Sequence, residues 1–184
     1  RSRKALRGED AAPELDVGES GSTLRFLAPI AAALGKRASF KTAGRLSQRP
    51  FVEYATLQSG LHELKGDVSS QFVTGLMFAL PLIKGDSQIK FTTPLESRGY
   101  VDMTVDVIRK AGVEIEENHE GFFIPGFQRY HRQFSAVEGD WSGGAFWYAM
   151  NALGCKIKVE GLSHDSLQPD LAISRLLPKL PDVV

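Results

Sequence analysis

The longest apolar run of the chain has no charged residue from Ser69 to Ile83 and begins directly at a cluster of polar side chains. Serine ahead of such a run is typical of a helix N-cap, so a helix is predicted to begin here. The run is apolar on nearly every face, which predicts a helix buried inside the domain. Ser69, Ser70 and Gln71 put hydrogen-bonding side chains at its N-terminus, where free N–H groups and the helix dipole favour an anion. Capping alone would explain an isolated serine pair, and the rest of the chain decides between the two interpretations.

The same order of elements occurs on both sides of this run. Towards the N-terminus we expect a strand over residues 15–17, a turn of small residues, an apolar helix that ends near Gly35, and a strand over residues 38–41. Pro29 is expected to kink that helix. Towards the C-terminus we expect an N-cap at Asp140, a helix over residues 145–153, a strand over residues 156–160 and a last helix over residues 170–179.

The segment after the apolar run has the clearest periodicity. A strand is predicted over residues 88–92 and is followed by an amphipathic helix with Val101, Val105 and Ile108 on one face and Gly112 as its end. Residues 113–116 and 122–124 are predicted to form a hairpin.

These passes are internal repeats, and each opens with a glycine followed by an acidic residue, at Gly18, Gly66 and Gly139. The chain is therefore predicted to be of the α/β (α+β) class, built of repeated βαβαββ-like units. The openings lie 48 and then 73 residues apart, so the first unit is short by about 25 residues between Pro50 and Gly66. Either the protein has lost a helix and a hairpin there, or the sequence joins two separated segments. We favour the second explanation, because losing these elements would expose core.

The composition of the chain makes several classes of partner and site unexpected. The 22 basic and 22 acidic residues cancel, which leaves no overall field to attract nucleic acid or a membrane. Cys155 is the single cysteine, so neither an internal disulfide framework nor a cysteine zinc site is possible, and we expect it to be packed. The four histidines are scattered, so no metal site is expected. With no signal peptide or membrane-length apolar run, the expected location is the cytoplasm.

Taken together, residues 18–25, 66–72 and 97–102 and the pair Arg49-Pro50 resemble the 5-enolpyruvylshikimate-3-phosphate (EPSP) synthase family. The resemblance implies two lobes, each an inside-out barrel of βαβαββ units with buried helices and outer sheets. Residues 1–136 would form part of the shikimate-phosphate lobe and residues 137–184 the start of the second lobe, so the fold would be incomplete. It also implies transfer of the enolpyruvyl group of phosphoenolpyruvate to the 5-hydroxyl of shikimate 3-phosphate. The implied enzyme is a monomer that needs no cofactor and has no other partner than these small molecules.

The resemblance also implies site residues. Those for shikimate 3-phosphate are Ser69, Ser70, Gln71, Ser97 and Tyr100, and those for phosphoenolpyruvate are Gly21, Arg49 and Gln71. Arg25, inside a helix, is interpreted as a structural ion pair or carbonyl contact. Two departures from the family pattern are Glu19, which brings a negative charge near an anion site, and Arg98-Gly99, which replaces a basic–proline pair.

No catalytic residue is assigned, because the family's catalytic segments are not recognisable in this chain. The chain by itself is therefore expected to bind without turnover. Two alternatives stay open. A UDP-N-acetylglucosamine enolpyruvyl transferase would need a reactive loop cysteine, and Cys155 is predicted to follow a core helix instead. A non-catalytic anion-binding lobe of the same fold would bind the ligand and do nothing more.

Overall fold

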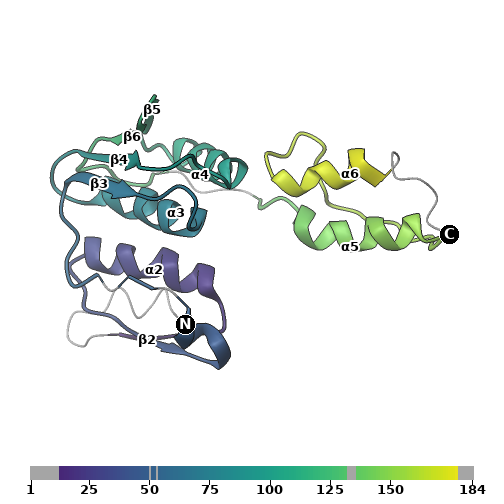
Figure 1. Cartoon of the computed structure of the whole chain (residues 1–184), viewed down its shortest axis with the longest axis horizontal. Helices are drawn as coiled ribbons and strands as arrows, with labels where there is room; N and C mark the ends of the chain where they lie inside the picture. The colour runs from purple at the N-terminus through teal and green to yellow at the C-terminus, as the bar shows by residue number, and fades with distance from the viewer. Residues whose placement is uncertain (1–12, 50, 53, 132–135, 178–184) are drawn as a thin grey trace. The chain divides into compact units, whose positions relative to one another are not determined.

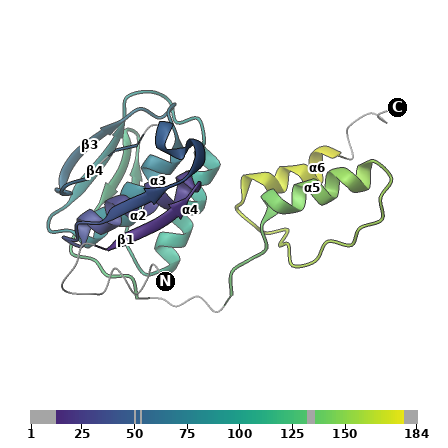
Figure 2. The ribbon, with the colours of Figure 1, turned by 90° about the horizontal axis from the view of Figure 1, so that it is seen from below.

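The structure is a computed structural model that describes residues 13–49, 51–52, 54–131 and 136–177. Contacts between Cα atoms divide the chain into one unit of residues Arg1–Arg132 and another of Gln133–Val184. Each unit is described by itself below, and Figures 1 and 2 show the elements of both.

The middle of the first unit is a complete βαβαββ motif. Its elements in chain order are β3 (Gly60–Leu64), α3 (Ser70–Ala79), β4 (Ser87–Phe91), α4 (Arg98–Lys110), β5 (Glu116–Asn118) and β6 (Gly121–Ile124). The strands form one sheet in the order β3-β4-β6-β5, in which β3 and β4 are parallel and the other pairs antiparallel. The predicted repeat unit is confirmed, together with the amphipathic helix and the hairpin. Strand β3, just ahead of Gly66, was not predicted and supplies the first strand of the motif.

The N-terminal part of this unit repeats the first half of the motif. Strand β1 (Glu14–Gly18) leads to α2 (Gly21–Ala33) and to β2 (Ser39–Thr42), which pairs in parallel with β1. A 3₁₀ turn, η1 (Gly44–Gln48), follows. Figure 1 shows α2 and α3 between the β1-β2 ribbon and the four-stranded sheet. The prediction of helices inside and sheets outside is confirmed, and no closed barrel forms among the described residues.

The main core explains why α3 carries apolar residues on nearly every face. It packs against α2 and α4, and its buried side chains share one core cluster with those of the sheet. Its fully buried side chains meet those of the sheet and of α4, and the cluster includes Val73, Leu76, Met77, Leu80, Ile89, Val101, Ile108, Phe122 and Ile124. A helix enclosed in this way has no solvent face to make polar, which is what the charge-free run predicts.

The crossing of α2 and α3 depends on a glycine. A Cβ atom built on Gly75 would overlap the backbone carbonyl of Arg25 and lie 3.1 Å from Cγ of Pro29. The two backbones can therefore approach this closely only without a side chain at position 75. Helix α2 continues past Pro29, which is buried against this contact.

The second unit contains α5 (Trp141–Ala152), the 3₁₀ turn η3 (Pro169–Ala172) and the short helix α6 (Ile173–Leu176). The predicted N-cap is confirmed, because the Asp140 carboxylate accepts hydrogen bonds from the backbone N–H groups of Ser142 and Gly143. The predicted last helix is much shorter than residues 170–179, and its final positions lie outside the described residues.

Two further predictions for the second unit are wrong. Residues 156–160 are not a strand, because no neighbouring strand is present to complete a ladder among the described residues. The Asn151 side chain instead donates to the carbonyl of Ile157 at 2.8 Å and accepts from its N–H at 2.7 Å. Cys155 is exposed rather than packed, since it follows the C-terminal end of α5. Across the described part of the chain, none of the helices is both long and apolar enough to cross a membrane.

We predict that Gly75→Ala destabilises the first unit, although helix propensity alone favours alanine by about 1 kcal/mol. The added methyl group would have to displace the Arg25 carbonyl, and overpacking of this kind costs about 1–3 kcal/mol. Urea unfolding measures the difference in unfolding free energy. An increase in stability would mean that α2 and α3 do not approach as closely as described.

Candidate anion-binding site

Three helices of the first unit point their N-termini to the same end. Arg25 Nη1, early in α2, donates to Oε1 of Gln71 at the start of α3 at 2.6 Å. The hydroxyls of Thr74 and Thr104 join α3 to α4 at 2.9 Å, each near the middle of its helix. One turn after Arg25, Pro29 lies against Gly75, so α2 and α3 run in the same direction. One turn before the threonine contact, Ser70 and Tyr100 line one cavity, so α4 runs in this direction too. Their free N–H groups and positive dipole ends therefore add up at one place.

The N-terminus of α3 is fixed by the loop in front of it. The N–H of Gly66 donates to Oγ1 of Thr93 at 2.9 Å, and the N–H of Glu96 donates to the Gly66 carbonyl at 3.2 Å. A Cβ on Gly66 would lie within 2.6 Å of the Pro94 carbonyl oxygen, so the two loops touch only because position 66 is glycine. This contact brings the segment that ends at Ser69 beside the segment that precedes α4.

The predicted serines occupy two different positions on their helices. Ser69 is the N-cap of α3 and accepts a hydrogen bond from the N–H of Gln71 at 3.3 Å. Ser97 is the N-cap of α4, but its side chain makes no capping hydrogen bond. The Ser69 hydroxyl is thus used for capping, whereas the Ser97 hydroxyl has no capping role.

A cavity of about 450 Å³ opens between these helices. Its lining is polar at the N-terminal end of α3 and apolar further along, and consists of Ser22, Phe26, Ser70, Gln71, Thr74, Phe78, Tyr100, Met103, Thr104 and Val107. The structure therefore brings the predicted residues Ser70, Gln71 and Tyr100 to one cavity. Ser22 was not predicted. Its position after Gly21 at the start of α2, like that of Ser70 after Ser69, is a signal that could have identified it.

The start of α2 carries the positive charge of the site. Ser20 caps this helix by accepting from the N–H of Thr23 at 3.3 Å. Gly21 is buried, and a Cβ there would lie 2.9 Å from Nη1 of Arg25. The absence of a side chain at the predicted residue Gly21 thus leaves room for the guanidinium group of Arg25.

Arg25 belongs to this site, although its sequence context indicated a structural role. It does contact a carbonyl, as predicted, but that carbonyl is the side-chain oxygen of the predicted ligand residue Gln71. The guanidinium group also lies over the ring of Phe72, 5.0 Å from its centroid. The four-residue spacing from Gly21 places both on one helix face, which is the signal that the sequence interpretation left unused.

The predicted residue Arg49 lies close enough to Arg25 for its charge to act on that residue. Burial lowers the pKa of Arg25, and the positive charge of Arg49 lowers it further. Both effects oppose the cationic form, and a bound anion would relieve the second directly. Arg49 itself is exposed and lines a separate cavity of about 540 Å³ beside α2 and β2. The arginine pair therefore supplies local positive charge in a chain without net charge.

The negative charge of Glu19 lies against η1. A Cβ on Gly44, at the start of that turn, would overlap the Glu19 carboxylate, and Gly44 has a φ of +55°. Glycine is required there both for this contact and for the left-handed backbone. Elsewhere in the described residues, no group of three or more His, Cys, Asp or Glu side chains is arranged to hold a metal ion.

Comparison with known proteins agrees with this geometry. The sequence profile of the family described as EPSP synthase (3-phosphoshikimate 1-carboxyvinyltransferase) matches residues 51–180. The 3-phosphoshikimate 1-carboxyvinyltransferase of Clostridium kluyveri is 44% identical over an alignment of 189 residues, gaps included. The alignment covers 90% of this chain and 44% of the relative. That of Clostridium novyi is 42% identical over 190 residues, with the same coverage of each chain. This chain thus spans somewhat less than half the length of these curated relatives.

A solved structure shows the same fold. The EPSP synthase from Acinetobacter baumannii superposes with a TM-score of 0.59 at 18% sequence identity, over 80% of this chain and 38% of that one. At this identity the likeness concerns the fold alone, and the family assignment rests on the profile and on the curated relatives. The chain belongs to the EPSP synthase (3-phosphoshikimate 1-carboxyvinyltransferase) family.

Proposed function

We propose that this chain contributes the shikimate 3-phosphate-binding lobe of an enzyme that transfers the enolpyruvyl group of phosphoenolpyruvate to the 5-hydroxyl of shikimate 3-phosphate and releases phosphate. The observation that carries the proposal is the convergence of three helix N-termini on Ser70, Gln71 and Tyr100, beside the pair Arg25 and Arg49. Such a site suits anionic ligands and offers both hydroxyl donors and guanidinium groups. Membership of the family supplies the reaction.

The two substrates would use different parts of the site. The phosphate of shikimate 3-phosphate would lie at the N-terminus of α3, with Ser69, Ser70 and Gln71 as donors and with Ser97 and Tyr100 approaching from α4. Phosphoenolpyruvate would lie nearer to Gly21 and Arg49, because a planar guanidinium group can hold a carboxylate or a phosphate with two parallel hydrogen bonds. Gln71 would reach both, and Arg25 would orient its amide.

The remaining groups that the reaction needs are proposed to come from outside this lobe. Addition of a hydroxyl to phosphoenolpyruvate, followed by loss of phosphate, requires a base, an acid for the methylene carbon and cations around the departing phosphate. We assign none of the described residues to the acid or base role. Phosphate binding at the helix ends would then be one half of a site that a second lobe completes and closes to water.

The lobe boundaries predicted from the sequence are part of this proposal. Residues 1–136 would belong to the shikimate-phosphate lobe and residues 137–184 to the start of the second. The division of the chain near Arg132 supports a boundary in this region. Helix α5 begins with its own side-chain N-cap, as α2 and α3 do, which supports its place as the start of another unit.

We further propose that the sequence joins two segments between Pro50 and Gly66, which family members separate by a further helix and hairpin. The alignment with the Clostridium kluyveri protein is 189 residues long, but it includes only 90% of the 184 residues of this chain. The relative therefore has residues without a counterpart here. The profile match begins at residue 51, where the repeat spacing is short. The cytoplasmic location, the monomeric state and the absence of a cofactor predicted from the sequence stay predictions.

The alternative of a UDP-N-acetylglucosamine enolpyruvyl transferase gains no support. Cys155 is exposed at the end of α5 in the second unit, outside the helix ends that form the candidate site. The alternative of a non-catalytic anion-binding lobe predicts the same ligand contacts and differs only in turnover.

The first prediction concerns the N-terminus of α3. Ser70→Ala and Gln71→Ala should each weaken shikimate 3-phosphate binding by about 1–3 kcal/mol, because each removes a hydrogen bond to a charged group. Gln88→Ala on β4, which removes an amide that contacts Glu120 in the β5-β6 turn, is the matched control and should leave the affinity unchanged. Calorimetric titration measures all three. Equal affinities in the site variants and the control would exclude this helix end as the phosphate site.

A second prediction separates the two substrates. The test uses an enzyme as long as the curated relatives that contains this chain. In it, Arg49→Lys should raise the KM for phosphoenolpyruvate more than the KM for shikimate 3-phosphate. Lysine keeps the charge but loses the two-pronged geometry of the guanidinium group. Steady-state kinetics with each substrate varied in turn gives both constants, and equal changes would show that Arg49 has only a structural role.

The chain by itself should bind shikimate 3-phosphate and release no phosphate above background when phosphoenolpyruvate is added. Half of the cleft would stay open to water, where electrostatic stabilisation is weak. A phosphate-release assay on the purified 184-residue chain tests this. Turnover would mean that an acid or base lies among these residues, and Asp102 and Asp140 would be the first to replace.

A further inference from the structure

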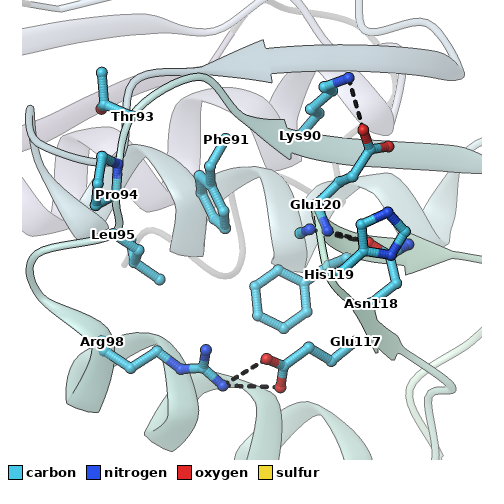
Figure 3. Close-up of a pocket in the computed structure, with 12 residues that line it drawn as sticks. Lys90, Phe91, Thr93, Pro94, Leu95, Arg98, Glu117, Asn118, His119 and Glu120 are labelled. Atoms are coloured by element: carbon cyan, nitrogen blue, oxygen red, sulfur yellow. Dashed lines mark hydrogen bonds and ion pairs between the residues drawn. The ribbon is translucent and has the colours of Figure 1, made fainter.

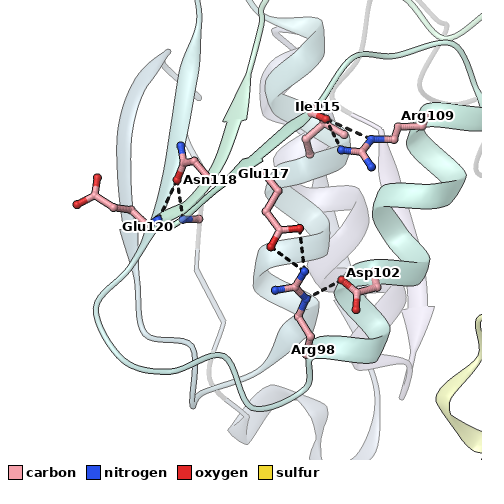
Figure 4. Close-up of polar contacts among 8 residues, drawn as sticks. Arg98, Asp102, Arg109, Ile115, Glu117, Asn118 and Glu120 are labelled. Atoms are coloured by element: carbon pink, nitrogen blue, oxygen red, sulfur yellow. Dashed lines mark hydrogen bonds and ion pairs between the residues drawn. The ribbon is translucent and has the colours of Figure 1, made fainter.

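Arg98 lies between two of the proposed ligand residues and takes part in a network of its own. It is the first residue of α4, directly after Ser97 and two positions before Tyr100. Its Nε donates to Oδ1 of Asp102 at 2.6 Å, and its Nη2 donates to both carboxylate oxygens of Glu117 at 2.7 and 2.8 Å. Figure 4 shows the guanidinium group between the two carboxylates. These hydrogen bonds, that of Asp102 first, raise the pKa of Arg98 and keep it charged.

The network connects the start of α4 to the edge of the four-stranded sheet. Asp102 is one helical turn further along α4, whereas Glu117 belongs to β5, the edge strand. The turn after β5 is itself fixed, because Oδ1 of Asn118 accepts from the N–H groups of Glu120 and Gly121 at 2.9 and 3.0 Å. Glu117 is thus a defined anchor, and Arg98 ties the first turn of α4 to it.

The segment before α4 is held to the Gly66 loop on one side, and on its other side it faces the β5-β6 hairpin across an open space. A cavity of about 480 Å³ lies between the segment that contains Thr93, Pro94 and Leu95 and the β5-β6 hairpin (Figure 3). The Arg98–Glu117 bridge spans one side of that cavity. Gly99 follows in the first turn, and glycine loses more conformational entropy on folding than any other residue. The buried side chain of Val101 holds this turn from the core side, and the bridge at Arg98 restrains it from the side of the hairpin.

The guanidinium group does not share a cavity with the proposed ligand residues. Residues two apart in an α-helix point about 200° away from each other, so Arg98 and Tyr100 lie on opposite faces of α4. Accordingly, Arg98 lines the cavity beside β5, and Tyr100 lines the one beside α3. The side chain of Arg98 acts on the candidate site through the backbone that it holds.

We propose that Arg98 is a positioning residue of the shikimate 3-phosphate site: through its bridge to Glu117 it holds the first turn of α4 so that Ser97 and Tyr100 meet the ligand. This inference rests on the proposed function for the identity of the ligand. The restraint on residues 97–100 is a property of the chain alone and can be measured without a ligand.

The test compares Arg98→Gln with Lys110→Gln in the whole chain. Lys110 forms an i,i+4 ion pair with Asp106 on the same helix, and its side chain is 56% exposed against 48% for Arg98, so the control removes a similar surface charge away from the site. Hydrogen exchange reports the amides of residues 100–103, which donate to the carbonyls of the first turn, and calorimetry reports the dissociation constant for shikimate 3-phosphate. We expect faster exchange at residues 100–103 and an about two- to fivefold higher dissociation constant for Arg98→Gln only. Glu117→Gln should reproduce both effects, and the double variant should add nothing further.

The possible results separate this inference from the proposed function. Unchanged exchange at residues 100–103 in Arg98→Gln would overturn the positioning role, whatever the affinity does. Faster exchange without loss of affinity would also overturn it, because the held turn would then not matter for the ligand. If the unchanged chain does not bind shikimate 3-phosphate at all, the proposed function fails, and with it the ligand assigned here, even where the exchange shows the restraint.

Discussion

The candidate site depends on the close, parallel packing of α2 and α3. Gly75 lets the backbone of α3 approach the Arg25 carbonyl, and this contact places the two N-terminal turns side by side. Burying a helix on all faces requires apolar residues along its length, so the polar side chains of α3 lie at its N-terminus, apart from Thr74, which bonds Thr104. The same packing that forms the core therefore concentrates hydroxyl, amide and guanidinium groups at one edge of the helix layer.

The arginine pair Arg25 and Arg49 places positive charge at the start of α2, where burial opposes the charged form of Arg25. Burial and the positive charge of Arg49 both lower the pKa of Arg25, and an anion bound here would favour its charged form. Shifted pKa values are common where a protein binds a ligand. Arg98 has the opposite character, since Asp102 and Glu117 neutralise it and it gives rigidity rather than charge. The first unit thus combines an arginine pair beside α2 with ion pairs that hold α4.

Local patterns predicted much of this fold, and contacts between distant residues account for the errors. The N-caps at Ser69 and Asp140 and the buried face of α4 follow from neighbouring residues, and all are present. Strand β3 has only a weak alternation and exists because it pairs with β4, whereas residues 156–160 have a better pattern and no partner. The place of Arg25 in the site depends on Gln71, 46 positions away, and no local pattern contains that contact.

The central claim is that the helix ends at Ser22, Ser70 and Tyr100 form one anion site in the lobe. Its most direct test is an NMR titration of the 184-residue chain with shikimate 3-phosphate, with inorganic sulfate as a reference anion. The account predicts that backbone amide shifts change mainly at residues 20–22, 69–71 and 97–100, with sulfate reproducing part of the pattern at higher concentration. Shift changes centred instead on Lys90 and His119, beside the β5-β6 hairpin, or no shift changes at all, would contradict it.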